Sequence, residues 1–220
     1  MPAVIFDLDG TLVDLFDVHL AGFKAVLLHE FGLNFERRDL SETYGKSGEE
    51  IIGVFLKSQG IIDADCHSLA KARRKWVIDN LVECKLLPGA VEILTALKAE
   101  GFKVGLGTSN TENIGEKIVS AGGLSNFFDA KAYRSDDIRS KPFPDIFLKA
   151  ASLLGEAPMQ CIVVEDSVHG IAAAKAAGMK SVAVATGTHT FRDLESMNPE
   201  KVVKSLNDVD VSVFRSLLKV

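Results

Sequence analysis

Strand-like and helix-like segments alternate from residue 88 onward, and this alternation constrains the fold more than any other feature. Strands are predicted at residues 103–107, 128–132, 161–164, 181–185 and 201–204, and helices at residues 88–100, 112–121, 144–155, 168–177 and 211–218. An apolar run at residues 4–6 predicts one more strand. Such alternation predicts an α/β fold with a doubly wound parallel sheet. Ligands bind these sheets at the carboxyl ends of the strands.

The segment between the first strand and residue 83 contains helical patterns and no strand pattern. Apolar residues recur at three- and four-residue spacing in three stretches, at residues 18–28, 49–58 and 65–81. A chain of 220 residues is long enough for one domain and a smaller insert. We therefore predict an all-helical insert at residues 15–82, and a core domain made of residues 1–14 and 83–220.

Charge and composition are typical of a metabolic enzyme. The net charge of −5 argues against a nucleic-acid partner. The N-terminus lacks a signal-peptide pattern, and no segment approaches the ~20 apolar residues that span a membrane, so no membrane partner is expected. Three widely spaced cysteines favour reduced thiols in the cytoplasm. The dense basic run at residues 71–75 is interpreted as a solvated helix face. A monomer and a small homo-oligomer both stay open.

Three separate stretches of sequence deliver polar groups to the same expected edge of the sheet. They are Asp7 and Asp9 after the first strand, Thr108, Ser109 and Asn110 after the strand at 103–107, and Glu165 and Asp166 after the strand at 161–164. Taken singly, each stretch has a plain structural explanation, as an Asp-Gly turn, a helix cap or a solvated turn. Because all three reach one edge, we predict a functional site there.

The acidic residues of this edge predict a site for Mg²⁺. Asp7 and Asp9 repel each other, and burying both is costly unless a cation compensates. Hard cations such as Mg²⁺ take oxygen ligands.

Two further stretches suit an anion. Residues 108–110 stand at a helix start, where backbone N–H groups are free. Lys141 is presented by a proline-containing loop, although a solvated lysine in a proline turn is the alternative.

The string IFDLDGTLVD at residues 5–14 resembles the first motif of the haloacid dehalogenase-like (HAD) phosphohydrolase superfamily, DxDGT followed by Leu or Val. Later motifs recur in family order, so the resemblance covers nearly the whole chain. It implies that Asp7 is the nucleophile, which takes the phosphoryl group as an aspartyl-phosphate, and that Asp9 is the general acid/base. It also implies that Thr108 hydrogen-bonds the phosphoryl group and that Lys141 neutralises Asp7 and a phosphate oxygen.

The same resemblance implies a metal site and substrate contacts. Asp166 would be a direct Mg²⁺ ligand, joined by a carboxylate oxygen of Asp7, the backbone carbonyl of Asp9, and Glu165 through a metal-bound water. The substrate-binding residues would be Thr108, Ser109, Asn110, Lys141, Lys46 and His19. The acid at position 9 favours phosphomonoester chemistry, since the family's dehalogenases and phosphonatases lack one.

The helical insert resembles the family's small cap domain, and the chain looks closest to the branch of β-phosphoglucomutase and small sugar or glycolate phosphatases. The loop at residues 45–48 is the expected specificity segment, in which Lys46 meets a charged substrate or is a plain surface lysine. His19 matches a mutase position that assists proton handling, or is a helix residue at the hinge. Where the mutase cap has an arginine that holds the distal phosphate, this chain has Gly48.

These observations predict a cytoplasmic, Mg²⁺-dependent phosphatase that acts on a small phosphorylated metabolite, of the sugar phosphate or phosphoglycolate type. One alternative is a phosphoryl-transferring isomerase similar to β-phosphoglucomutase, against which Gly48 argues. Another is a non-catalytic binding module on the same fold, against which the complete set of site residues argues. The sequence does not identify the substrate.

Overall fold

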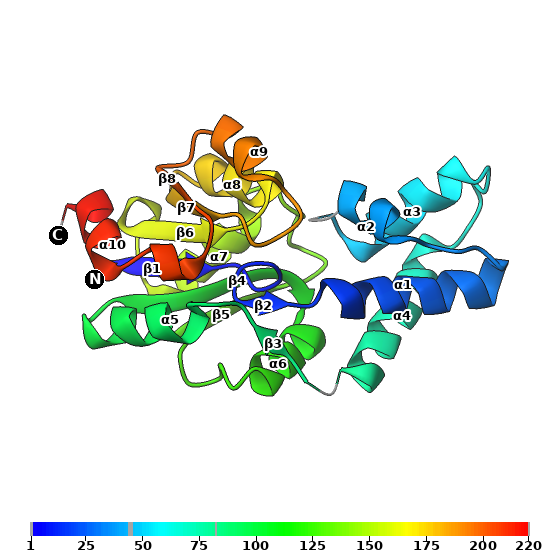
Figure 1. The fold of residues 1–220 in the computed structure, drawn as a ribbon, viewed down its shortest axis with the longest axis horizontal. Coiled ribbons are helices and arrows are strands. Elements are labelled where there is room, and N and C mark those ends of the chain that lie inside the picture. The colour runs from blue at the N-terminus through cyan, green and yellow to red at the C-terminus, as the bar shows by residue number, and fades with distance from the viewer. Residues whose placement is uncertain (1, 44–45, 82, 220) are drawn as a thin grey trace.

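The computed structural model describes residues 2–43, 46–81 and 83–219, which form a larger lobe built on a sheet and a smaller helical lobe (Figure 1). The six-stranded parallel sheet has the order β5-β4-β1-β6-β7-β8. Its strands are β1 (Ala3–Phe6), β4 (Lys103–Thr111), β5 (Ala130–Arg134), β6 (Cys161–Glu165), β7 (Lys180–Val184) and β8 (Lys201–Val203). The first strand lies in the middle and the order reverses there, so the predicted doubly wound α/β fold is confirmed.

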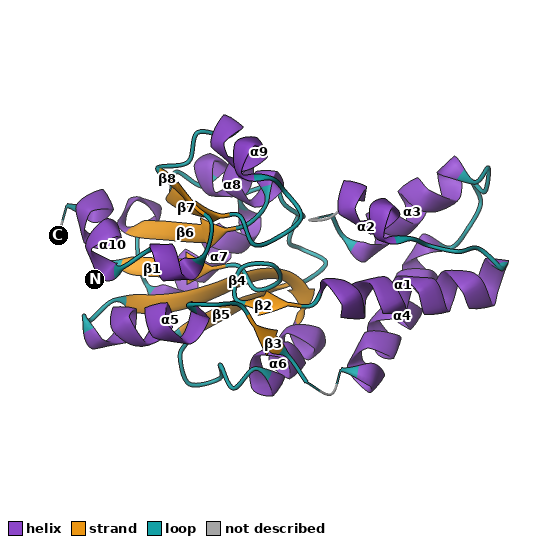
Figure 2. Cartoon of the chain, viewed as in Figure 1, coloured by secondary structure: helices purple, strands orange, loops and turns teal. Residues whose placement is uncertain are grey.

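Helices cover both faces of this sheet (Figure 2). They are α5 (Ala90–Ala99), α6 (Glu112–Ala121), α7 (Asp145–Leu154), α8 (Val168–Ala176), α9 (Phe191–Ser196) and α10 (Val211–Leu218), with short 3-10 helices at Pro158–Gln160 and Leu206–Asp208. In β1, Val4 and Phe6 pack with α5, α6 and α10, whereas Ala3 and Ile5 pack with α7 and α8. Alternate side chains of a strand point to opposite faces, which is why this doubly covered strand reads as an unbroken apolar run.

The smaller lobe is an insert with a hydrophobic core of its own. It consists of α1 (Phe16–Phe31), α2 (Arg37–Thr43), α3 (Gly48–Ser58) and α4 (Cys66–Asn80). The ring of Phe35 packs against Phe23 and Phe55, with centroids 5.1 and 4.9 Å apart. The predicted helical insert is thus confirmed. We propose residues 15–82 as its limits, of which 44–45 and 82 lie outside the described residues.

The chain segments that connect the two lobes pair with each other. They form the short antiparallel strands β2 (Val13–Asp14) and β3 (Lys85–Leu86). The sequence patterns indicate neither this pair nor α2 and α9, because two to seven residues are too few to show a period. These elements are fixed by pairing and capping instead, as in α9, where Thr190 and Asp193 form a reciprocal capping box.

Strand β4 is longer than predicted. It continues to Thr111 instead of ending at residue 107, because its pairing with β5 shifts register after Gly107 and resumes with Thr111 opposite Arg134. Thr108, Ser109 and Asn110 therefore lie on the irregular extension of the strand, shortly before α6, and the prediction that they follow the end of the strand is wrong. They still occupy the carboxyl edge of the sheet.

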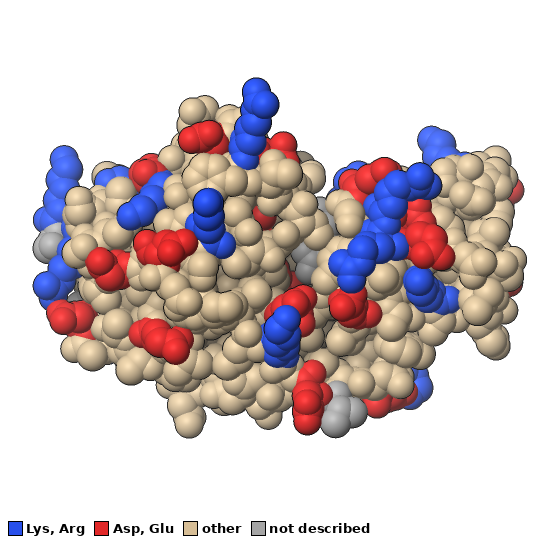
Figure 3. All heavy atoms as spheres, in the orientation of Figure 1, with Lys and Arg blue, Asp and Glu red and all other residues tan. Residues whose placement is uncertain are grey.

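The surface carries charges of both signs. In the view of Figure 3, Lys and Arg side chains are interspersed with Asp and Glu side chains over both lobes. Lys71 and Lys75 of α4 are exposed, as predicted, and Lys75 pairs with Asp79 at 2.7 Å. Among the helices in the described residues, none is long and apolar enough to cross a bilayer.

Candidate active site

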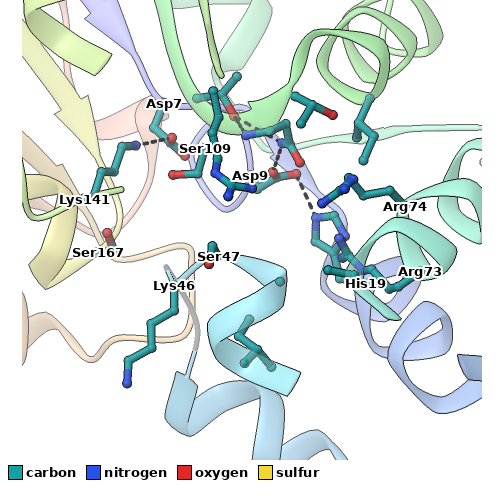
Figure 4. Close-up of a pocket in the computed structure, with 18 of the residues that line it drawn as sticks. Asp7, Asp9, His19, Lys46, Ser47, Arg73, Arg74, Ser109, Lys141 and Ser167 are labelled. Carbon is teal, nitrogen blue, oxygen red and sulfur yellow. Dashed lines mark hydrogen bonds and ion pairs between the residues drawn. The ribbon is translucent and has the colours of Figure 1, made fainter. Parts of the chain in front are cut away.

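One pocket between the two lobes collects every residue that the sequence analysis proposes for the site (Figure 4). These residues are Asp7, Asp9, His19, Lys46, Thr108, Ser109, Asn110, Lys141, Glu165 and Asp166. Strands β1, β4 and β6 are neighbours in the sheet, so the side chains at their carboxyl ends meet where the strand order reverses. The pocket volume of about 100 Å³ has room for several water-sized spheres, which suits a small ligand.

Lys141 bridges two carboxylates in the interior of the site. Its Nζ lies 2.5 Å from Oδ1 of Asp7 and 2.8 Å from Oε1 of Glu165, and all three side chains are buried. Nζ also lies 4.7 Å from the ring centroid of Phe147. Burial alone would lower the pKa of Lys141, but the two ion pairs raise it above its ordinary value. Lys141 is therefore a permanent buried cation, which excludes the alternative of a solvated lysine.

Asp7, Glu165 and Asp166 form a buried acidic cluster that fits a divalent cation. One carboxylate oxygen of each lies within 4.8 Å of the others. Burial raises the pKa of Asp7 to about 7, although Lys141 opposes the rise. Burial, and then the charges of Glu165 and Asp7, raise the pKa of Asp166. Since one lysine does not balance three carboxylates, a hard cation would relieve the remaining repulsion.

The Asp166 carboxylate is held with one oxygen open. Its Oδ1 accepts a hydrogen bond from Thr11 Oγ1 at 3.0 Å, whereas its buried Oδ2 has no partner in the described part of the chain. Two glycines keep the space around Oδ2 open, because a Cβ atom on Gly10 or Gly187 would lie 2.3 or 1.8 Å from it. Buried oxygens normally have a partner, so this open position fits a metal ligand.

Both oxygens of Glu165 are engaged by the protein. Oε1 accepts a hydrogen bond from Lys141 at 2.8 Å, and Oε2 accepts bonds from the backbone N–H and the hydroxyl of Ser167, at 2.6 and 2.8 Å. These bonds fix the carboxylate beside Asp166. They leave few lone pairs for a direct metal bond, which fits a contribution through water.

Asp9 faces the helical insert and is ionised in the resting protein. Its Oδ2 accepts a hydrogen bond from Asn110 Nδ2, and its Oδ1 lies 3.4 Å from Nε2 of His19. Burial opposes ionisation, but the interactions with His19 and Asn110 outweigh it and lower the pKa of Asp9. The amide side chain of Asn110 therefore holds Asp9 in the resting protein.

Arg73 of α4 fixes the tautomer of His19. A guanidinium only donates hydrogen bonds, so its contact with Nδ1 of His19 leaves Nε2 to carry the ring proton toward Asp9. Burial, and then the charge of Arg73, lower the pKa of His19. His19 therefore lies between Arg73 and Asp9, with its Nε2 3.4 Å from Oδ1 of Asp9.

The remaining predicted residues differ in how they face the pocket. Thr108 is buried, and its Oγ1 accepts bonds from the backbone N–H and Nδ2 of Asn110 at 3.2 and 3.1 Å, which leaves its hydroxyl hydrogen for another acceptor. Ser109 is half-buried and lines the pocket. Lys46 also lines it, but its ammonium group points away from Asp7 and Asp9 (Figure 4). Gly45, in the same loop, lies outside the described residues.

The interpretation of residues 71–75 as a solvated face is wrong for Arg73 and Arg74. Arg73 is buried, Arg74 is half-buried, and both line the pocket. Arg73 shares the buried face of α4 with Leu69 and Val77, a four-residue spacing that is visible in the sequence. Arg134, at the end of β5, also lines the pocket. No pattern in the sequence predicts it as a site residue.

Fold and site together define a class of protein. A doubly wound parallel sheet, with a helical insert facing its carboxyl edge and a lysine–carboxylate cluster in the pocket between them, is the architecture of an α/β enzyme. Comparison with known proteins defines the family. Residues 4–184 match the haloacid dehalogenase-like hydrolases, and the chain belongs to that family.

Individual relatives agree with this membership. The fructose-1-phosphate phosphatase YqaB of Escherichia coli is 31% identical over 181 residues, covering 82% of this chain and 95% of that protein. The β-phosphoglucomutase of Bacillus subtilis is 33% identical over 194 residues, covering 85% and 84%. The crystal structure of a family IA HAD hydrolase from Entamoeba histolytica superposes with a TM-score of 0.87 at 25% identity, covering 100% of both chains. The predicted family and a phosphatase-type enzyme are therefore confirmed.

Proposed function

We propose that this chain hydrolyses the phosphate ester of a small metabolite, of the sugar phosphate or phosphoglycolate type. One observation carries the proposal. The buried Asp7 lies 2.5 Å from Lys141 and shares an acidic cluster with Asp166, in a pocket of about 100 Å³. A carboxylate nucleophile, a cation for the phosphoryl oxygens and a metal site are what phosphoryl transfer through an aspartate requires. Similarity to a protein named fructose-1-phosphate phosphatase supports the substrate class.

The acidic cluster supports Mg²⁺ as the cofactor. Asp7 and Asp166 would each contribute a carboxylate oxygen, Asp9 its backbone carbonyl, and Glu165 a contact through water. When bound, the cation neutralises charge on the phosphoryl oxygens. The open Oδ2 of Asp166 and the raised pKa of Asp7 support this proposal, because both reflect negative charge that Lys141 leaves unbalanced.

The residues of the pocket divide the reaction into two steps. In the first, Asp7 attacks phosphorus in line, the bond to the leaving oxygen breaks, and Asp9 gives that oxygen a proton. In the second, Asp9 takes a proton from the water that attacks the aspartyl-phosphate, which releases inorganic phosphate and restores Asp7. Lys141 and Thr108 hydrogen-bond the phosphoryl oxygens throughout. Asp9 is ionised in the resting protein, so it takes up a proton from the phosphate group of the substrate or from solvent before the first step, and it carries a proton again after the second.

A mutase similar to β-phosphoglucomutase is the second candidate. In that reaction Asp7 would return the phosphoryl group to another hydroxyl of the substrate. The contact between His19 and Asp9 favours it. Gly48 argues against it, because it offers no side chain where the mutase cap has an arginine for the distal phosphate. The space there is open, since an added Cβ would meet only the ring of Phe23 at 4.0 Å. A hydrolase releases free phosphate and a mutase a rearranged sugar phosphate, so product analysis separates the two.

Phosphate release from a panel of small phosphomonoesters, with Mg²⁺ and with EDTA, tests the proposed function. We expect release from one or a few esters, only when Mg²⁺ is present. The Asp7→Asn protein, purified in the same way, controls for contaminating phosphatases. Rearrangement of a glucose phosphate without net release would favour the mutase. A protein that turns over no ester in either assay would favour a binding module.

Gly187→Ala is expected to weaken the metal site without unfolding the protein. The new Cβ would lie 1.8 Å from Oδ2 of Asp166, so the carboxylate must move away from its present position. Changes to the groups that orient a ligand typically cost 10–100-fold in metal affinity. The Mg²⁺ concentration for half-maximal activity should rise by about that factor. Gly53→Ala is the matched control, since its Cβ would make an ordinary 3.7 Å contact with Cys66. Equal Mg²⁺ requirements in both variants would contradict the assignment of Asp166.

A further inference from the structure

Two arginines, one from each lobe, line the pocket without a carboxylate partner. Arg74 lies on α4 of the insert and Arg134 ends β5 of the core, and both are half-buried. Within the described residues, neither forms an ion pair. By contrast, Arg37, Arg139 and Arg215 on the surface each pair with a carboxylate. These two cations therefore share one pocket, and no carboxylate of the described residues forms an ion pair with either.

The two arginines stand away from the phosphoryl end of the pocket. In Figure 4 the labelled side chains run from Lys141 and Asp7 on one side, past Asp9, to Arg74 on the other. Arg134 pairs with Thr111 in the register of β4 and β5, one residue further along β4 than Asn110, which contacts Asp9. A ligand with its phosphoryl group at Asp7 would therefore extend past Asp9 toward the arginines.

The electrostatics of this end of the pocket favour an anion. Burial, and then the charge of Arg134, lower the pKa of Arg74, and the carboxylates of Glu49 and Asp136 only partly offset this. An anionic group between the two guanidinium groups would replace their repulsion with charge-assisted hydrogen bonds. Arginine matches carboxylates and phosphates especially well, because its planar fork binds two oxygens at once.

We propose that Arg74 and Arg134 form a subsite for a second acidic group of the substrate, a carboxylate or a second phosphate. The inference rests on the proposed function, since it takes the phosphoryl group to lie at Asp7. Because one arginine comes from each lobe, a ligand with two acidic ends spans the insert and the core. Gly48 offers no cationic side chain for the end of the substrate that is remote from the reaction. The subsite would supply that contact instead, from α4 and β5.

Paired esters that differ only in the second acid test this subsite. Phosphoglycolate is compared with hydroxyethyl phosphate, and a propanediol bisphosphate with propyl phosphate. A lost charge-assisted contact costs about 10–100-fold. We expect Arg74→Gln and Arg134→Gln each to lower kcat/KM for the acidic ester by about that factor, mainly through KM, and to leave the neutral ester nearly unchanged. Lys71→Gln on the exposed face of α4 and Arg192→Gln on α9 are charge-matched controls and should change neither. The ester pair on which the arginine variants have the larger effect shows whether the second acidic group is a carboxylate or a phosphate.

The same variants distinguish failure of the subsite from failure of the proposed function. The subsite is overturned if the two variants lower kcat/KM equally for acidic and neutral esters, or if they lower it for no ester. In either case the proposed phosphatase activity is still supported. If the wild type releases phosphate from no ester, the proposed function fails. Calorimetric titration of the Asp7→Asn protein with the propanediol bisphosphate then decides the subsite. Binding that Arg74→Gln and Arg134→Gln each weaken about tenfold or more supports it, and binding that they leave unchanged overturns it.

Discussion

Replacing Asp7 by asparagine is expected to lower phosphate release by at least about 10⁴-fold, because a carboxamide does not form the covalent phosphoryl intermediate. The other acids of the site have different proposed roles, with Asp166 as a metal ligand. Asp9 is held by Asn110 and His19, and Glu165 is held by Lys141 and Ser167. Initial rates of phosphate release on the best ester of the panel, at saturating Mg²⁺, measure the effect.

The Asp7→Asn protein is expected to remain folded. The pKa of Asp7 is raised to about 7, so the folded protein already accommodates the neutral, protonated form of this side chain. Asparagine is neutral and has nearly the same shape. Lys141 keeps Glu165 as a partner at 2.8 Å. Thermal unfolding in EDTA checks this, with Asp14→Asn, at the exposed position of β2, as the matched control. Activity comparable to the wild type in a folded Asp7→Asn protein would contradict the nucleophile assignment.

The acidic half of the site could be predicted from the sequence because parallel sheets place strand ends predictably. Asp7 and Glu165 each stand at the end of an apolar run, and the strands that carry them pair directly. A residue at such a position reaches the carboxyl edge whatever the details of packing. Lys141 lies outside the strands, so its residue type and loop suggested contact with an anion, and the resemblance to the family indicated its place beside Asp7.

The cationic half depends on tertiary features that no local pattern contains. Arg134 reaches the pocket because β4 shifts register against β5 after Gly107 and pairs again at Thr111. Arg74 reaches it because α4 packs beside α1 and α3 of the insert and also contacts α6 of the core. The burial of Arg73 was readable from its spacing to Leu69 and Val77, but the surrounding charges favoured the interpretation of a solvated face.

Lys141→Met is expected to lower both activity and stability. The variant loses the cation that holds the phosphoryl oxygens, a kind of electrostatic contact whose removal typically costs 10²–10³-fold in kcat. It also leaves two buried carboxylates, Asp7 and Glu165, without their 2.5 and 2.8 Å ion pairs. Removing one partner of a buried pair typically destabilises a protein by about 3–5 kcal/mol. Denaturant unfolding in EDTA measures the second effect separately from the first.

The loss of stability in Lys141→Met is expected to grow with pH. The raised pKa of Asp7 means that, between its ordinary value of 3.8 and about 7, the folded protein binds more protons than the unfolded chain. Stability therefore falls as the pH rises through this window. Without Lys141 the pKa of Asp7 rises further and the window extends upward. The gap between variant and wild type should be small near pH 4, where Asp7 is protonated, and larger near pH 8.

A double variant separates the loss of charge balance from the loss of packing. Adding Glu165→Gln to Lys141→Met removes one of the two uncompensated carboxylates, while the glutamine side chain keeps most of the volume of the glutamate that it replaces. We expect the double variant to be more stable than Lys141→Met near pH 8 in EDTA. Activity should stay low in both, because neither restores a cation beside Asp7. A pH-independent deficit that Glu165→Gln does not relieve would show that Lys141 stabilises the fold through its contact with Phe147 and not through its charge.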